Sequence, residues 1–316
     1  MKPVVLALVG PTGSGKTKTA IRICQALDAE IVSMDSMQVY RGMDIGTAKP
    51  TKEEQSAAPH HMIDVVGPDQ MFTVSMYRGM ACKTIDDILA RGKVPLLVGG
   101  TGLYLQAISY EMSLGENGAD HALRESLQRI AGEKDGPQRL HDRLAQVDPA
   151  SAEKLHPNDV RRVIRALEIY ETSGRAKSEQ ADKQHREGPY HVLVYGLSLP
   201  REQMYARINA RVDEMVKSGL IDEVKGLLKR GIEPKPEGGA MQAIGYKEIV
   251  SALRGEMRME RAIDLIKQGS RRYAKRQWTW FRHDQRTKWF DWTAYESESA
   301  LIDDLLCHIR EDIRNT

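Results

Sequence analysis

Eight residues close to the start of the chain have the types and the spacing of a phosphate-binding loop. The stretch GPTGSGKT at 10–17 has the pattern GxxxxGK(S/T). Its glycines allow successive backbone N–H groups to face an anion, and the start of a following helix adds positive potential. Lys16 supplies a positive charge, and the Thr17 hydroxyl can bind Mg²⁺. The pattern predicts that a diphosphate or triphosphate binds to Gly10, Pro11, Thr12, Gly13, Ser14, Gly15, Lys16 and Thr17.

Two further residues could do chemistry beside such a phosphate. The strand-like run 29–34 is followed by Asp35, and the run 94–98 leads into Gly-Gly-Thr-Gly, which contains Thr101. Ligands of parallel sheets bind at the carboxyl ends of the strands, so we expect Asp35, Thr101 and the loop around one crevice. From its position alone, Asp35 could equally be a turn or helix-capping aspartate. The run 94–98 lacks the terminal Mg²⁺-binding aspartate of ATPases and kinases.

Alternating strands and helices are expected to position these residues. Val4–Val9 is a short apolar run before the loop, and Lys16–Leu27 has helical spacing after it. We expect further strands at 29–34, 94–98 and 191–199, and helices at 73–91, 201–230, 257–282 and 297–314. This alternation predicts an α/β fold with a P-loop NTPase-like, doubly wound parallel sheet.

The middle of the chain differs from both ends. Between 114 and 189 the sequence is polar and helical, with turns at Gly136-Pro137, Asp148-Pro149 and His156-Pro157, and it contains no convincing strand. We interpret 114–189 as an inserted all-helical domain. Residues 1–113 and 190–316 would then form the catalytic core with its C-terminal helices.

Composition excludes several classes of protein. The 316 residues are 41% hydrophobic and 28% charged, which is too apolar for a disordered chain. No apolar run approaches the ~20 residues of a membrane span, and the first residues leave no room for a signal peptide. Three scattered cysteines without CxxC spacing argue against disulfides and a zinc finger. We expect a cytoplasmic protein, and a monomer is the simplest interpretation.

Seven stretches, in order along nearly the whole chain, give a family resemblance. They are GPTGSGKT (10–17), SMDSMQVYRGMDIGTAKP (33–50), PHHMIDV (59–65), LLVGGTGLY (96–104), HPNDVRRVIRALEIYETSGR (156–175), AIGYKE (243–248) and RRYAKRQWTWFR (271–282). Through them the chain resembles the tRNA dimethylallyltransferases, or isopentenyltransferases, in their bacterial form. Several of these stretches are specific to that family rather than to phosphate-loop proteins in general.

The resemblance implies a prenyl transfer without nucleotide hydrolysis. The loop would hold the diphosphate of dimethylallyl diphosphate, with Mg²⁺ on Thr17. The dimethylallyl group would pass to the exocyclic N6 amine of the adenosine 3′ to the anticodon, in tRNAs that read UNN codons. Asp35 would be the general base and Thr101 would orient the amine or a leaving oxygen. Lys16 and one of two arginines, Arg207 or Arg211, would stabilise the diphosphate, and of the two we prefer Arg211. Spacing alone also fits a solvated arginine face.

The resemblance also implies contacts with the tRNA anticodon stem-loop. In 159–167, apolar and basic residues fall on opposite faces of a helix, which by itself also fits an ordinary solvated face. In 271–276, basic pairs four apart form a stripe. For Trp278, Trp280 and Phe281 we expect packing in the core, with stacking on bases as the alternative. Besides Asp35 and Thr101, the expected tRNA-binding residues are Ser36, Met37, Gln38, Arg124, Asp159, Val160, Arg161, Arg162, Val163, Gln242, Lys247, Arg272, Lys275 and Arg276.

Three other functions compete with this interpretation. A prenyltransferase acting on free adenosine nucleotides would need neither the insertion nor the basic C-terminal stripe. A phosphate-loop kinase would be expected to have the strand-end aspartate that 94–98 lacks. A non-catalytic RNA-binding module would leave the phosphate loop and Asp35 without a role.

Overall fold

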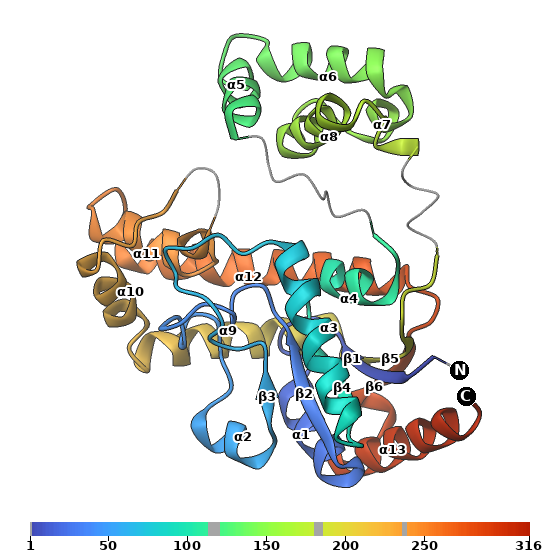
Figure 1. Cartoon of the computed structure of the whole chain (residues 1–316). Helices are drawn as coiled ribbons and strands as arrows, with labels where there is room; N and C mark the ends of the chain where they lie inside the picture. The colour runs from blue at the N-terminus through green and yellow to red at the C-terminus, as the bar shows by residue number, and fades with distance from the viewer. Residues whose placement is uncertain (1, 113–120, 180–185, 236–238) are drawn as a thin grey trace. The chain divides into compact units, whose positions relative to one another are not determined.

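Six parallel strands form one sheet in the computed structural model, which describes residues 2–112, 121–179, 186–235 and 239–316 (Figure 1). The spatial order is β3-β2-β4-β1-β5-β6. The strands are β1 (Val4–Val9), β2 (Ala29–Met34), β3 (His60–His61), β4 (Val94–Gly99), β5 (His191–Ser198) and β6 (Lys288–Asp291). The parallel sheet predicted from the sequence is confirmed.

The register of the strands brings three loops to one edge of the sheet. Val9 of β1 and Met34 of β2 both pair with Gly99 of β4. The next residue after each of these strands therefore lies at the same level, at their carboxyl ends. Those following residues are Gly10, Asp35 and Gly100.

Helices cover both faces of the sheet. Because side chains alternate along a strand, Val5, Ala7 and Val9 pack on one face, while Leu6 and Leu8 pack on the other. The first face is covered by α3 (Val74–Ala90) and α4 (Gly102–Ser109). The second is covered by α1 (Lys16–Leu27) and α13 (Glu298–Arg314). The sheet is thus doubly wound, as predicted.

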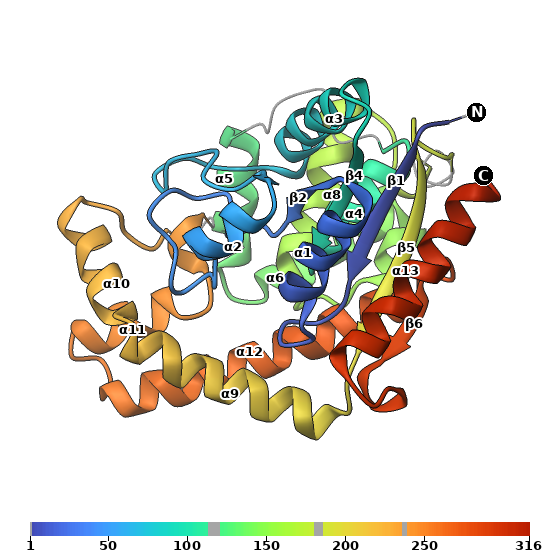
Figure 2. The same ribbon diagram turned by 90° about the horizontal axis from the view of Figure 1, so that it is seen from below.

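A further group of helices lies beyond the carboxyl ends of the strands. Figure 2 shows β1 pointing toward α9 (Arg201–Lys217) and α12 (Met259–Arg282), which lie side by side. With α10 (Leu220–Lys229), η2 (Ala240–Gln242) and α11 (Tyr246–Leu253), they enclose a separate apolar core. The remaining short elements of this unit are α2 (Lys52–Ala57) and η3 (Trp292–Ala294).

The chain divides into two compact units, 1–109 with 189–316 and 110–188. The predicted insertion, 114–189, has slightly different bounds. In the second unit the described residues form α5 (His121–Ala131), α6 (Gly136–Val147), α7 (Pro149–Lys154) and α8 (Val160–Ser173). Leu127, Leu140, Leu144, Val163 and Leu167 are the centre of its own core.

Sequence patterns missed both edge strands and misplaced one aromatic side chain. β3 and β6 have only two and four residues, which is too short for a clear alternation. Phe281 is completely buried as expected, whereas the expectation of core packing was wrong for Trp280, which is 40% exposed. Among the helices that the structure describes, none combines the length and apolarity that a membrane crossing requires.

Candidate active site

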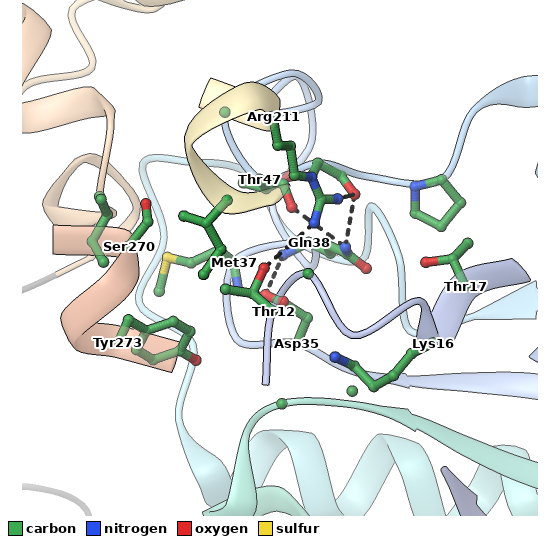
Figure 3. Close-up of a pocket in the computed structure, with 18 of the residues that line it drawn as sticks. Thr12, Lys16, Thr17, Asp35, Met37, Gln38, Thr47, Arg211, Ser270 and Tyr273 are labelled. Carbon is green, nitrogen blue, oxygen red and sulfur yellow. Dashed lines mark hydrogen bonds between the residues drawn. The ribbon is translucent and has the colours of Figure 1, made fainter. Parts of the chain in front are cut away.

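A cavity of about 760 Å³ opens at the carboxyl ends of β1, β2 and β4. Gly13, Lys16, Asp35 and Gly100 contribute to it from the three loops that the strand register aligns. Figure 3 shows Arg211 of α9 and Tyr273 of α12 on its other walls. The expected crevice is therefore present, and every residue that lines it belongs to the unit that contains the sheet.

The β1–α1 loop has the backbone geometry of an anion cradle. Gly10 and Gly15 have φ angles of 144° and 91°, a region that side chains disfavour. A Cβ on Gly10 would lie 2.6 Å from the Leu197 carbonyl oxygen, so only glycine fits there. The Trp292 indole N–H donates to the Ser14 carbonyl oxygen at 2.7 Å, which holds the loop from the side of η3. Ser14 itself is completely buried and does not line the cavity.

Lys16 lies at the base of this loop, and its pKa is lowered strongly from the ordinary value of a lysine. Its ammonium group donates to the Gly10 and Pro11 carbonyl oxygens at 2.9 and 2.8 Å. Burial, and then the positive charge of Arg211, lower the pKa of Lys16 to about 7, although the negative charge of Asp35 opposes the shift. An anion bound in the loop would favour the charged form of this lysine.

Asp35 both stabilises a turn and faces the cavity. Its Oδ1 accepts hydrogen bonds from the backbone N–H groups of Met37 and Gln38, at 2.8 and 3.3 Å. Burial raises the pKa of Asp35, and the two N–H groups, Lys16 and Arg211 oppose that rise. Both hydrogen bonds from described residues go to Oδ1, so Oδ2 is the oxygen suited to accept a proton.

Thr101 lies behind the cavity wall rather than on it. Its N–H donates to the Met34 carbonyl oxygen at 3.1 Å, which ties the end of β4 to the end of β2. Its hydroxyl is buried and has no hydrogen-bond partner of normal geometry among the described residues. Tyr273, which was not among the expected site residues, lines the cavity as Asp35 does. Burial and the charge of Asp35 raise the pKa of Tyr273 to about 12, against an opposing effect of the Thr101 side chain.

The two candidate arginines of α9 have different surroundings. Arg211 donates to the Thr12 hydroxyl and to the Ala48 carbonyl oxygen, each at 3.4 Å, and so bridges the phosphate loop and the loop after β2 (Figure 3). Arg207 lies one turn earlier, with its guanidinium 5.9 Å from the centre of the Trp292 ring. Both arginines line the cavity, and Arg211 is the one that donates a hydrogen bond to the phosphate loop, so we expect Arg211 to meet a bound phosphate.

We expect Arg211→Gln to weaken binding of inorganic diphosphate about 10–100-fold, because hydrogen bonds to charged groups contribute about 1.5–3 kcal/mol. The matched substitution Arg207→Gln should weaken it no more than about fivefold, since Arg207 acts on the loop through Trp292 and a cation–π contact contributes about 0.5–1 kcal/mol. Isothermal titration of the two variants with inorganic diphosphate checks both values. Equal losses in the two variants would contradict the distinction drawn from their contacts.

The loop that follows Asp35 is held by side chains that sequence reasoning did not single out. Glu223 of α10 accepts hydrogen bonds from the N–H groups of Asp44, Ile45 and Gly46 at 2.8, 2.8 and 3.1 Å. It also accepts one from the Tyr246 hydroxyl at 2.6 Å. No motif predicts this contact, because Glu223 lies on a helix far along the chain.

Of the residues expected to read a base, Ser36, Met37 and Gln38 line the cavity. The Gln38 amide is already engaged: Oε1 accepts from the Ser33 hydroxyl at 3.2 Å, and Nε2 donates to the Thr47 and Ala48 carbonyl oxygens at 3.4 and 3.2 Å. Gln38 thus holds its loop in place. Gln242, Lys247 and Arg276 also line the cavity, whereas Arg272 and Lys275 are exposed on α12 outside it.

The other expected tRNA-binding residues lie in the second unit, on or beside α8. Arg161 and Arg162 are exposed, and Val160 is partly buried. The Arg162 guanidinium forms an ion pair with the Asp159 carboxylate at 3.2 Å. The prediction that Val163 contacts tRNA is wrong for its side chain, which is completely buried in the core of this unit.

Arg124 makes an intramolecular ion pair in the same unit. Its guanidinium contacts both carboxylate oxygens of Glu168 at 2.8 Å. Arg165 also contacts Glu168, at 3.1 Å, and the Glu168 side chain is nearly completely buried. The predicted tRNA contact of Arg124 would therefore use a side chain that already neutralises a buried carboxylate.

Comparisons with known proteins find relatives along nearly the whole chain. A family model described as IPP transferase matches residues 38–284, and one described as isopentenyl transferase matches residues 3–64. The tRNA dimethylallyltransferase of Oceanobacillus iheyensis is 47% identical over 313 residues, which cover 99% of this chain and 97% of that protein. The tRNA dimethylallyltransferase of Symbiobacterium thermophilum is 48% identical over 311 residues, covering 98% and 96%.

Two solved structures show the same likeness in three dimensions. The full-length tRNA isopentenylpyrophosphate transferase of Bacillus halodurans is 44% identical, with a TM-score of 0.74 and coverage of 100% of this chain and 98% of that one. A eukaryotic dimethylallyltransferase, described as acting on tRNA, is 31% identical with a TM-score of 0.79. That match covers 92% of this chain and 74% of the eukaryotic one.

Proposed function

The chain belongs to the IPP transferase family, and on this premise we propose that it is a tRNA dimethylallyltransferase. It transfers the dimethylallyl group of dimethylallyl diphosphate to the exocyclic N6 amine of the adenosine 3′ to the anticodon, in tRNAs that read UNN codons. One observation supports this chemistry most directly: the carboxylate of Asp35 shares a cavity with the phosphate loop and Arg211. The cavity therefore combines a proton acceptor with groups that bind a departing anion.

The reaction forms an N–C bond and breaks a C–O bond. An adenine amine is a poor nucleophile because its lone pair is delocalised into the ring. Asp35 accepts the amine proton as nitrogen attacks the allylic carbon, which raises the reactivity of the amine. The electrons of the broken C–O bond move to the diphosphate, where Lys16, Arg211 and the N–H groups of the loop stabilise the added negative charge.

We propose that Mg²⁺ accompanies the diphosphate at Thr17. Thr17 lines the cavity next to Lys16, and a hydroxyl with phosphate and water oxygens is a donor set that suits this ion. Mg²⁺ does not need a protein cage, because it retains several water ligands and binds through few protein groups. When bound, it would neutralise charge on the diphosphate. Thr17 would hold it, and the loop N–H groups would bind the oxygens that remain.

We propose that tRNA binds to the exposed basic residues of both units, in the cytoplasm where this substrate is found. These are Arg161 and Arg162 of the second unit, and Arg272 and Lys275 on the exposed side of α12. Reaching one base of a structured loop costs a few kcal/mol of unstacking, which contacts with the phosphate backbone must offset. Exposed arginines and lysines are the groups that make such contacts.

Replacing Arg161 and Arg162 together with alanine is expected to weaken tRNA binding and reduce its salt dependence. Each phosphate contact that is lost lowers the slope of log K against log salt by about 1. A double substitution of Arg139 and Arg143, which are exposed on α6, removes the same charge from the same unit and should change the slope less. Filter binding over a salt series measures both slopes, and equal slopes would place the tRNA elsewhere.

A transfer assay tests the proposed function itself. Purified protein and Mg²⁺ are mixed with radiolabelled dimethylallyl diphosphate and either unmodified tRNA that reads UNN codons, AMP or ATP. Label that appears only in the tRNA supports the proposal. Label in the free nucleotide would favour the nucleotide prenyltransferase, and ATP consumption without transfer would favour a kinase. A tRNA whose adenosine next to the anticodon is replaced by guanosine should receive no label.

A further inference from the structure

One buried side chain of α12 joins the phosphate loop to the loop after β4. Gln277 is 6% exposed, and its Oε1 accepts a hydrogen bond from the Thr12 N–H at 2.9 Å. Its Nε2 donates to the Gly100 carbonyl oxygen at 3.0 Å. A Cβ on Gly100 would lie 1.9 Å from Nε2, so the glycine is what allows the amide to approach. The two bonds require an acceptor and a donor on the same planar group, which an amide provides.

These contacts continue to the proposed base. The N–H of Thr101, the residue after Gly100, donates to the Met34 carbonyl oxygen at 3.1 Å, and Asp35 follows Met34. Gln277 thus connects the loop for the diphosphate with the strand ends that hold the carboxylate. The pairing also turns the Thr12 N–H toward α12, while the Thr12 hydroxyl contacts Arg211 at 3.4 Å.

We propose that Gln277 is a positioning residue that fixes the separation between the bound diphosphate and Asp35, and so the alignment of the prenyl carbon with the amine. The inference rests on the proposed function and deepens it. Gln277 lines the cavity, but its amide oxygen and nitrogen are bonded to Thr12 and Gly100, so we assign it a role through the two loops that it joins. Misalignment of reacting groups by about 1 Å can lower a rate about 10²-fold, so this role concerns the transfer step more than substrate affinity.

The substitution Gln277→Leu and the matched control Gln268→Leu test the inference. Gln277→Leu keeps the volume but leaves the Thr12 N–H and the Gly100 carbonyl unpaired. We expect it to lower the single-turnover rate of transfer about 10–100-fold, with affinity for inorganic diphosphate and for tRNA changed less than about threefold. Gln268 is exposed on the same helix, so Gln268→Leu is the matched control and should leave both quantities unchanged.

Gln277→Glu adds a second measurement, the pH dependence of the transfer rate, which a purely structural role of Gln277 would not change. When protonated, the new carboxyl group can accept from the Thr12 N–H and donate to the Gly100 carbonyl, as the amide does. When ionised, the carboxylate has no proton to donate, so it repels the Gly100 carbonyl oxygen instead of bonding to it. The transfer rate of this variant, divided by the wild-type rate at the same pH, should therefore rise as the pH falls from about 8 to about 5.5. The same ratio for Gln277→Leu should not change with pH.

Folding and activity are separated by measuring circular dichroism and Tm for each variant before the assay. A rate within twofold of wild type for folded Gln277→Leu, or a ratio for Gln277→Glu that does not change with pH, would overturn the inference and leave the proposed function standing. A wild-type protein that transfers nothing to tRNA would overturn both. If Gln277→Leu does not fold, the pH dependence of Gln277→Glu decides the question.

Discussion

Asp35→Asn is expected to lower the single-turnover rate of prenyl transfer about 10²–10⁴-fold in a protein that folds normally. Asparagine keeps an oxygen at the position of Oδ1, which accepts hydrogen bonds from the N–H groups of Met37 and Gln38 at 2.8 and 3.3 Å. The turn that Asp35 stabilises is therefore retained. What the variant loses is an oxygen that can accept the proton of the amine.

The measurement is a rapid-quench assay at saturating tRNA and prenyl diphosphate, which isolates transfer from binding. Asp303→Asn, exposed on α13, is the matched control and should keep the wild-type rate. A rate within a few-fold of wild type for Asp35→Asn would mean that another group takes the proton. It would also return Asp35 to the role of a turn residue.

The same carboxylate predicts how the wild-type rate depends on pH. Burial raises the pKa of Asp35 above that of an ordinary aspartate, against the opposing effects of two N–H groups, Lys16 and Arg211. A base must be ionised to act, so transfer should be lost as the pH falls through this raised pKa. The loss should therefore begin at a higher pH than an ordinary aspartate would give, and it should be absent from the residual activity of Asp35→Asn.

Local patterns were sufficient for the parts of the site that follow strands. The loop 10–17, Asp35 and the Gly99-Gly100 turn each come directly after a buried apolar run, and parallel strands place their carboxyl ends together. The sequence therefore predicted which residues meet, although it could not decide whether Asp35 caps a turn or faces a substrate. In the structure, Oδ1 of Asp35 accepts the hydrogen bonds of the turn, and Oδ2 has none from the described residues and can face a substrate.

Residues that reach the site from distant helices could not be predicted in this way. Gln277 contacts the loop across 265 positions, and Trp292 does so across 278. Glu223 contacts three successive N–H groups from yet another helix. Their contacts depend on how α10, α12 and η3 pack, which no spacing within those elements reveals.

The error at Val163 has a different cause. Helical spacing had already placed this residue on the apolar face of its helix, with Val160 and Leu167. Its place among the expected tRNA contacts came from carrying over a continuous stretch of the family motif. A motif marks an element as functional, whereas periodicity decides which of its side chains reach the solvent, and here periodicity was right.

Lys16→Met is expected to weaken binding of inorganic diphosphate about 10–100-fold, because it removes charge-assisted hydrogen bonds to the anion. Methionine nearly matches the length of the lysine stem, so the packing of the loop should change little. Lys83 is exposed on α3 and does not line the cavity, so Lys83→Met removes the same charge from a position away from the site. This control should keep affinity within about threefold of wild type.

The loss of diphosphate affinity in Lys16→Met should depend on pH if the pKa of Lys16 is lowered, and it should not if that pKa is ordinary. Burial and Arg211 lower the pKa of Lys16 to about 7, so the free protein loses this proton as the pH rises through 7. The bound anion favours the charged lysine, so binding above pH 7 takes up a proton and weakens by as much as about tenfold per pH unit. The affinity of wild type relative to Lys16→Met should therefore fall between about pH 7 and pH 9.

Titration calorimetry in two buffers of different ionisation enthalpy measures both the affinity and the proton uptake. Wild type should take up close to one proton more than Lys16→Met at pH 8, and the difference should disappear near pH 5.5. An affinity ratio that stays constant from pH 6 to pH 9 would mean that Lys16 is already fully charged in the free protein. In that case the two carbonyl oxygens of Gly10 and Pro11, at 2.9 and 2.8 Å, would stabilise its charge despite the burial.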